Sequence, residues 1–411
     1  MDNKQMIIID QPITCKDGQD WLVSTKVRIN ERIFELWFRS NSGPLSDGIE
    51  SFVAACLVPA MKLGYAIQSP GPISAHWLTG LTAYQHTIQQ FFPELRIIPV
   101  LGETKQSNQP RAKGVGSFFS CGVDACYTFL KHHDEITAGI LIHGFDYLQN
   151  KALAKNAASS LAQQATAKLN RPLIEVETNI RSLGDEYVPF DTHYHGSVLA
   201  SVALLLSPQL GTVYIPSSYH YDDLFPWASH PELDPLWSTE ATQIHHDGCD
   251  VTRSQKVDCV AQNDAALSVL RVCFKEYTTS GAAYNCGMCE KCVRTMVDLR
   301  IAGALERCPT FRRSLRLKSI ARIDLRHAKK NVSFYKGSLK QAKHKGNDPA
   351  LEQALEECLS GIHYRGIEGF FHDARKFAYR DVLRPMIRPI ERTVRKISRK
   401  INPAANSTTN Q

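Results

Sequence analysis

Four cysteines late in the chain have the residue type and spacing of a metal site. Cys273 ends an apolar stretch, and Cys286, Cys289 and Cys292 follow it at two successive C-x2-C spacings. Cysteine thiolates bind Zn²⁺ tetrahedrally, and a C-x2-C pair on a tight turn supplies two ligands with little strain. Because four sulfurs fill the coordination shell, we expect a structural zinc ion with no open position for a reacting water. An iron–sulfur cluster and unliganded thiols are the two alternatives.

A second segment, residues 116–130, has the pattern of an anion site. An apolar strand is predicted to end at Phe119, small residues turn the chain, and a helix is predicted to begin at Asp124. Unpaired N–H groups converge in such a loop, and the helix dipole adds positive charge. Ser120 can donate a hydrogen bond, while Asp124 can cap the helix or hold Mg²⁺. The alternative is a strand-to-helix turn that binds nothing.

This loop resembles the pyrophosphate loop of the ATP pyrophosphatases, the adenine nucleotide alpha hydrolase-like enzymes. Residues 120–126 lie over the S-G-G-x-D-S-[ST] motif of that family. Its members adenylate a carboxylate, an amide or a tRNA base with ATP, and a nitrogen or sulfur nucleophile then displaces AMP. The resemblance implies catalytic roles for Ser120 and Asp124, and it implies ATP and Mg²⁺ as ligands. The implied ATP-binding set is Ser120, Cys121, Gly122, Val123, Asp124, Ala125, Cys126, His143 and Gly144.

Two positions depart from the family motif. Cys121 replaces its first glycine, and a side chain at a position of positive φ costs about 1–2 kcal/mol. Ala125 replaces a serine, and losing one hydrogen bond to a charged group costs about 1.5–3 kcal/mol. These departures leave two alternatives open. One is a non-catalytic nucleotide-binding scaffold, and the other is a sulfur-transferring enzyme in which Cys121 or Cys126 is the nucleophile.

The cysteine spacing narrows the resemblance. A strand cysteine followed by C-x2-C-x2-C, late in a pyrophosphate-loop domain, is similar to the 7-cyano-7-deazaguanine synthase family. That family converts a carboxylate to a nitrile with ATP and ammonia. The similarity covers residues 113–300 of this longer chain, and it implies a ligase that activates a carboxylate-like group of a small-molecule acceptor and transfers it to a nitrogen nucleophile.

Further site candidates lie between the loop and the cysteines. Arg253 and Lys256 are one helical turn apart and can neutralise phosphate charge, with a solvated helix face as the alternative. His195 begins a predicted helix and is a candidate contact for substrate or nucleotide. Residues 226–239 form an aromatic loop that can line a pocket. Residues 245–247, His-His-Asp, are weak evidence for a metal.

The alternation of predicted strands and helices along the chain predicts an α/β protein with a parallel sheet and helices on both faces, of the pyrophosphate-loop type. The predicted strands of this part are Val115–Phe119, Gly139–His143, Leu173–Glu177, Thr212–Ile215 and Leu267–Cys273. The predicted helices are Asp124–Lys131, Asn150–Leu169 and His195–Leu206. The predicted domains are an N-terminal α+β domain (1–105), the ATP-binding domain with the zinc site (113–305), a helical region (306–370) and a basic tail (371–411).

The net charge of +7 is concentrated in that tail. From residue 373 onward ten basic residues oppose three acidic ones, so the remainder of the chain is neutral. Apolar residues at spacings of three and four predict an amphipathic helix after Pro389, which can pack on this protein, lie on an anionic membrane surface or bind an acidic partner. Nucleic acid is less favoured because no aromatic residues interleave the basic ones. Without a secretory segment, we expect a cytoplasmic protein, with the inner membrane surface as the alternative.

Overall fold

The computed structural model describes residues 5–106, 110–145, 152–273, 285–326 and 329–362. Its centre is one 11-stranded sheet in the order β13-β12-β9-β10-β11-β4-β3-β1-β5-β7, with β2 paired to β3. The strands of this sheet are β1 (Met6–Ile9), β2 (Ile13–Asp17), β3 (Asp20–Ile29), β4 (Arg32–Ser40), β5 (Ala66–Gln68), β7 (Val100–Leu101), β9 (Gly114–Phe118), β10 (Ala138–His143), β11 (Leu173–Thr178), β12 (Leu210–Pro216) and β13 (Gln243–Asp247). A separate two-stranded sheet pairs β6 (Ile73–Ser74) with β8 (Thr104–Lys105).

The five strands from β9 to β13 are all parallel. β9 lies between β10 and β12, so the chain leaves β9 toward one edge of the sheet and later returns to its other side. This reversal of strand order is the topological switch point of a doubly wound sheet, and a crevice forms there beyond the carboxyl ends of the strands. The fold is therefore mixed α/β and compatible with a Rossmann-like arrangement, as the sequence predicted at that level.

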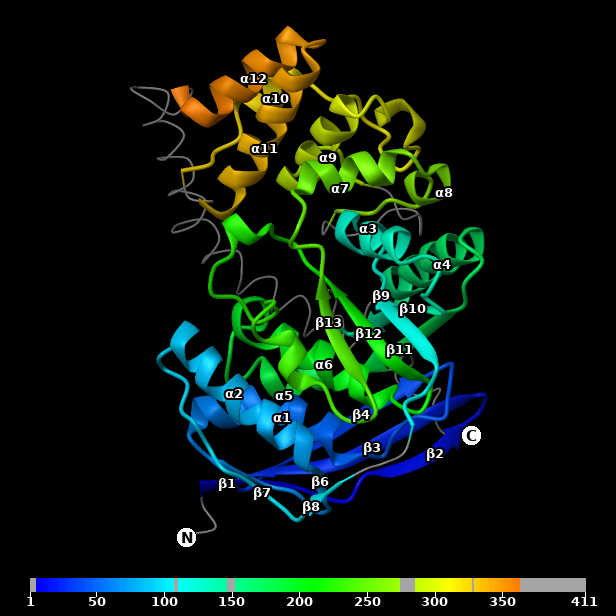
Figure 1. Cartoon of the computed structure of the whole chain (residues 1–411), viewed down its shortest axis with the longest axis vertical. Helices are drawn as coiled ribbons and strands as arrows, with labels where there is room; N and C mark the ends of the chain where they lie inside the picture. Colours follow the sequence, from blue (N-terminus) through cyan, green and yellow to red (C-terminus); the bar gives the residue numbers. More distant parts are fainter. Residues whose placement is uncertain (1–4, 107–109, 146–151, 274–284, 327–328, 363–411) are drawn as a thin grey trace, which may run out of the picture.

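Helices cover both faces of the sheet (Figure 1). One face carries α3 (Val123–Lys131), α4 (Ala152–Lys168), α7 (Arg253–Ala261) and α8 (Asp264–Leu267). The other carries α1 (Ile49–Leu63), α2 (Ala75–Phe91), α5 (Ile180–Gly184) and α6 (His195–Leu205). A third apolar cluster is built from α9 (Glu290–Ile301), α10 (Leu317–Ala321), α11 (Lys329–Lys345) and α12 (Pro349–Ser360).

The N-terminal strands continue the parallel sheet. β4 pairs antiparallel with β11, and the Asn179 side chain accepts a hydrogen bond from the Trp37 amide at 3.0 Å. On the covering face two buried hydrogen bonds join α1 to α6 and its N-cap: Tyr194 Oη, at the N-cap, donates to the Ala55 carbonyl, and Ser201 Oγ, in α6, donates to the Ser51 carbonyl. The region 1–105 thus shares its sheet and its core with the parallel half of the molecule.

The expected strand Leu267–Cys273 is wrong, and the fifth parallel strand is β13 instead. Asn263 caps α8 by accepting a hydrogen bond from the Ala266 amide, so the segment begins as a helical turn. It then continues irregularly, with the Arg271 amide donating to the Cys121 carbonyl at 2.7 Å. Most residues of β13 are polar, so its sequence does not show the apolar pattern of a buried strand. It is a strand because it pairs with β12.

The basic tail lies outside the described residues, so its expected partners stay predictions. Among the residues that the structure describes, no helix combines the length and hydropathy needed to span a bilayer.

Asp247, at the end of β13, ties this edge strand to α3. Its carboxylate accepts hydrogen bonds from Thr128 Oγ1 at 2.7 Å and Lys131 Nζ at 2.8 Å. Burial opposes the charge, but these bonds and one from His132 outweigh it and lower the pKa of Asp247. The carboxylate therefore stabilises the fold above its unfolded pKa of about 3.9, and this contribution is lost as the pH falls through the lowered folded value.

We expect Asp247→Asn to reduce the free energy of unfolding at pH 7 by about 2 kcal/mol, and we expect this difference to shrink steadily as the pH falls below about 3.9, measured by urea denaturation. Asp250→Asn is the control, because Asp250 is exposed and lies 3.6 Å from the same Lys131 amine, where ion pairs contribute little. Equal losses in the two variants at pH 7 would contradict this assignment.

Candidate functional site

A cavity of about 520 Å³ opens at the switch point of the sheet. The loop after β9 contributes Ser120, Gly122 and Asp124, and the segment after β12 contributes Ser218 and Tyr219. A second hollow of about 220 Å³ lies next to it and shares Ser120, Gly122 and Asp124. The sequence-predicted loop residues therefore lie where an open α/β sheet gathers its ligands.

The backbone of this loop has the conformation of an anion cradle. Cys121 has φ +61°, the left-handed region that favours the glycine of the family motif. Gly122 is the N-cap of α3 and has no side-chain cap. Within the described residues, no hydrogen bond engages the backbone N–H groups of residues 122–125. The left-handed cysteine costs about 1–2 kcal/mol, and strain of this kind is typical of functional loops.

Basic side chains from α7 surround the carboxylate of Asp124. Lys256 Nζ lies 3.4 Å from one carboxylate oxygen, and Arg253 Nη1 lies 3.5 Å from the other. Burial alone would raise the pKa of Asp124, but the charges of Lys256, Arg253 and Arg294 outweigh it, so the pKa is lowered. Asp124 is therefore an ionised carboxylate, the state that can hold a divalent cation.

Arg294, on α9, is the contact that sequence reasoning missed. Its side chain is 5% exposed and lines the cavity, while Nε and Nη1 have no hydrogen-bond partner. Glu290 Oε1 lies 3.4 Å from Nη1, close enough for an ion pair although without hydrogen-bond geometry. The Arg294 side chain also lines the cavity. A buried cation with unused donors is a strong site for an anionic ligand.

Aromatic side chains form the opposite wall of the cavity. Tyr219 and Phe334 stack at a ring separation of 5.6 Å, and the Arg294 guanidinium lies 4.1 Å from the Phe334 ring centre. Trp227, from the aromatic loop 226–239, lies 5.4 Å from the His195 ring. Burial lowers the pKa of His195, so this imidazole is neutral at pH 7 where it lines the cavity.

Other sequence candidates lie elsewhere. His143 is buried and its Nε2 lies 2.7 Å from Glu175 Oε2, outside the lining of either hollow. Gly144 has φ +104°, and a Cβ there would lie 2.3 Å from the Thr178 carbonyl oxygen, which accounts for the glycine by close approach alone. In the His-His-Asp segment Asp247 binds α3, whereas His246 Nδ1 lies 2.7 Å from Asp234 Oδ2.

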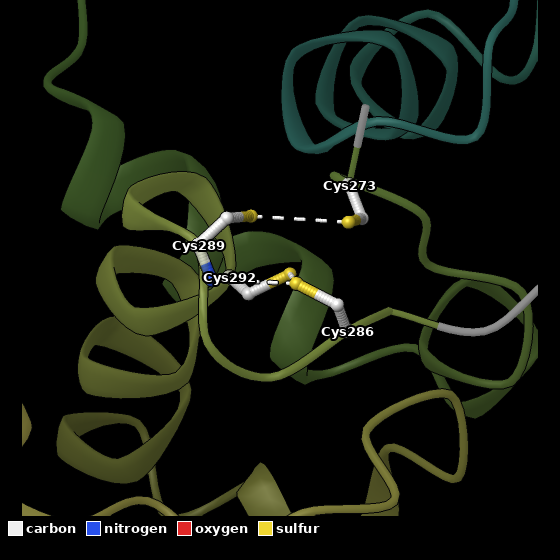
Figure 2. Close-up of side chains that lie close together, drawn as sticks. All are labelled: Cys273, Cys286, Cys289 and Cys292. Carbon is white, nitrogen blue, oxygen red and sulfur yellow. Dashed lines mark hydrogen bonds between the residues drawn. The ribbon is translucent and has the colours of Figure 1, made fainter. Parts of the chain in front are cut away.

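The four cysteines of the predicted metal site come together (Figure 2). Their Sγ atoms all lie within 4.8 Å of one another, and the Cys273–Cys289 and Cys286–Cys292 pairs are each 3.8 Å apart. Bonds of about 2.3 Å from zinc to four tetrahedral sulfurs require this same edge length. The Cys289 amide donates to Cys286 Sγ at 3.3 Å, and hydrogen bonding with the Cys292 thiol lowers the pKa of Cys289 to about 5 against the opposing effect of burial. The site can hold a metal such as zinc.

Asn285 links the segment that carries Cys273 to the segment that carries the other three cysteines. Its Oδ1 accepts hydrogen bonds from the Val272 and Cys273 amides, and its Nδ2 donates to the Leu270 carbonyl. Cys273 and Arg294 both line the cavity, so the cluster fixes the chain beside the ligand crevice. With four sulfurs present, the role that fits is structural.

Comparison of the chain with protein-family models, with curated proteins and with solved structures gave no match. The class of protein therefore follows from the molecule itself. It is an α/β protein with a cationic crevice at the switch point of its sheet and a four-cysteine cluster at the edge of that crevice.

We expect the purified protein to contain about one zinc ion per chain by elemental analysis. Cys286→Ser removes one of four ligands, and should weaken zinc binding by more than the 10–100-fold typical of changes around a metal ligand. Cys308→Ser is the control, because Cys308 is a thiol that donates to the Leu267 carbonyl outside the cluster. Iron with acid-labile sulfide would identify the competing cluster, and a metal-free, stable protein would contradict the metal site.

Proposed function

We propose that this protein is an ATP-dependent enzyme of the pyrophosphate-loop type. It activates a carboxylate-like group as an adenylate, releases pyrophosphate, and transfers the activated group to a nitrogen nucleophile with release of AMP. The observation that carries the proposal is the loop 120–125, whose unengaged amides face a cationic crevice at the switch point of the sheet.

The described side chains divide the crevice into two parts. The amides of residues 122–125, with Arg253 and Lys256 behind them, fit the polyphosphate of ATP. The hollow of about 220 Å³ is walled by apolar side chains such as Phe145, Leu199 and Ile215, which suit an adenine ring. Asp124 would hold Mg²⁺, which supplies charge neutralisation at the phosphates when bound.

The remaining part of the large cavity fits an acceptor. Tyr219, Trp227 and Phe334 present ring faces and edges for a planar group, and Arg294 supplies a positive charge in the lining for a carboxylate. The chain's contribution to adenylation is to align a carboxylate oxygen with the α-phosphorus and to stabilise the leaving pyrophosphate.

A non-catalytic nucleotide scaffold is the second candidate, and Ala125 and the left-handed Cys121 favour it. A sulfur-relay role for the loop thiols is disfavoured. Burial raises the pKa of Cys121 to about 12, and it raises the pKa of Cys126 well above its usual range. Thiols held protonated in this way are poor nucleophiles.

The discriminating experiment offers the purified protein ATP, Mg²⁺ and candidate carboxylates, and measures pyrophosphate and phosphate release separately. Arg253→Gln should weaken ATP binding about ten- to a hundredfold, because hydrogen bonds to charged groups contribute about 1.5–3 kcal/mol. Arg300→Gln is the control, since Arg300 is paired with Asp348 away from the cavity. ATP binding without pyrophosphate release for any acceptor would support the scaffold, and phosphate release instead of pyrophosphate would overturn adenylation.

Ala125→Ser restores the hydroxyl of the family motif at a position that lines the smaller hollow. We expect it to tighten ATP binding by about tenfold, measured by calorimetric titration. Ala261→Ser is the matched control, because Ala261 is similarly buried in the same apolar cluster on α7. Equal affinities in wild type and Ala125→Ser would count against the placement of the polyphosphate.

A further inference from the structure

The two hollows at the switch point of the sheet lie next to each other, and their linings have five residues in common. The residues shared by the cavity of about 520 Å³ and the hollow of about 220 Å³ are Ser120, Gly122, Asp124, Ser218 and Arg271. They come from three segments, which are the loop after β9, the segment after β12 and the segment before the cysteine cluster. A ligand that occupies both hollows must therefore pass beside these residues.

Arg271 is the only basic residue among these five, and the function proposed above gives it no role. Of the two hollows, Arg253 and Arg294 line only the larger one. The Arg271 side chain is half-buried, and its charge acts on the neighbouring loop. Burial raises the pKa of the Cys121 thiol, and the charge of Arg271 partly opposes that rise. The junction of the hollows is thus supplied with positive charge by a residue that is not part of the loop motif.

The backbone on both sides of Arg271 is held by hydrogen bonds. The Leu270 carbonyl accepts hydrogen bonds from Asn285 Nδ2 at 2.9 Å and from Thr310 Oγ1 at 2.7 Å. The Val272 amide donates to Asn285 Oδ1 at 2.9 Å. A side chain on a backbone fixed in this way starts from a defined position, which is what precise binding of a reacting group requires.

Backbone atoms of Arg271 also join this segment to the loop after β9. The Arg271 amide donates to the Cys121 carbonyl at 2.7 Å, and a Cβ at Gly122 would lie 3.7 Å from the Arg271 carbonyl oxygen. Both contacts remain when the side chain is replaced, because the backbone makes them. A substitution at Arg271 therefore tests the guanidinium while the loop keeps its support.

We propose that this junction is a subsite for the α-phosphate of the nucleotide, and that Arg271 is the catalytic residue that binds this phosphate. The direction of the ligand rests on the proposed function, with adenosine in the smaller hollow and the terminal phosphates at the loop. The α-phosphate links these two parts of ATP, so it lies where the two hollows meet. A guanidinium suits this place because its planar fork can donate two parallel hydrogen bonds to phosphate oxygens.

Adenylation brings two negative charges together, since an anionic carboxylate must approach an anionic phosphate. A carboxylate oxygen forms a bond to the α-phosphorus. The bond from that phosphorus to the bridging oxygen breaks, and its electron pair leaves with pyrophosphate. No proton moves, and Arg271 stays charged throughout. The guanidinium lowers the barrier by neutralising the non-bridging oxygens of the α-phosphate.

The subsite divides the recognition of ATP between two arginines. Arg271 binds the α-phosphate, which AMP also carries. Arg253 lies beside Asp124 behind the loop amides, where the proposed function places the β- and γ-phosphates. Inorganic pyrophosphate represents these terminal phosphates without the α-phosphate. Loss of Arg271 should therefore weaken the binding of AMP, and loss of Arg253 should weaken the binding of pyrophosphate.

The experiment uses the full-length protein with Mg²⁺ and measures the binding of AMP, of inorganic pyrophosphate and of ATP by calorimetric titration. We expect Arg271→Gln to weaken AMP binding at least about tenfold and to leave pyrophosphate binding unchanged. Arg253→Gln is the matched comparison and should show the reverse pattern. Arg271→Lys keeps the charge but loses the fork, so its AMP affinity should lie between those of wild type and Arg271→Gln.

The catalytic role has its own measurement. With a carboxylate that sustains turnover, Arg271→Gln should lower kcat for pyrophosphate release at least about tenfold, whereas Arg300→Gln should leave it unchanged. An unchanged kcat in Arg271→Gln overturns the catalytic role.

The failure of the subsite and the failure of the proposed function give different results. Equal AMP affinities in wild type and a folded Arg271→Gln protein overturn the subsite, and so do equal losses of AMP and pyrophosphate binding, which indicate a distorted loop. If Arg271→Gln does not fold, an AMP affinity of Arg271→Lys equal to wild type overturns the subsite. AMP binding that depends on Arg271, in a protein that releases no pyrophosphate with any carboxylate, overturns adenylation and leaves the subsite standing. A wild-type protein that binds neither AMP nor ATP overturns both.

Discussion

The position of β9 between β10 and β12 is the constraint on which the site depends. Parallel pairing on both sides forces the chain to leave β9 toward one edge of the sheet and to return on the other. The loop after β9 therefore lies between two diverging connections, and side chains cannot fill the space above it. Everything placed around that space, from α3 to the cysteine cluster, is positioned by this choice of strand order.

The buried positive charges around the crevice destabilise the protein when no ligand is bound. Arg253 and Arg294 are both buried, and each keeps at least one guanidinium nitrogen without a hydrogen-bond partner. Unpartnered buried polar groups lose solvation that nothing replaces. Asp298, beneath them, binds Ser254 and Ser338 and supplies a compensating buried carboxyl group, although burial raises its pKa. An anionic ligand would relieve this imbalance, which is why the geometry favours a binding site over a purely structural cluster.

The cysteines of this chain lie in different surroundings, and the surroundings decide what each thiol can do. Cys121 and Cys126 are enclosed by apolar groups that keep them protonated. The four cysteines near residue 289 face one another and suit a metal. Cys249 is buried and donates a hydrogen bond to the Ser217 hydroxyl. A C-x2-C spacing is visible in a sequence because local turns set it, whereas the contact of Cys249 with Ser217 joins residues that lie far apart in the chain.

The sequence alone determined the local features of this protein. These include the class of the fold, the strand-to-helix loop at residues 120–125 and the cysteine cluster, because each shows as a pattern of residues close together in the chain. The sequence misplaced the fifth strand, since β13 is a strand only through its pairing with β12. Only the tertiary structure decided which distant side chains meet. Arg294 and Phe334 carry no local signal, and they reach the crevice because the sheet order and the packing of α7, α9 and α11 bring them there.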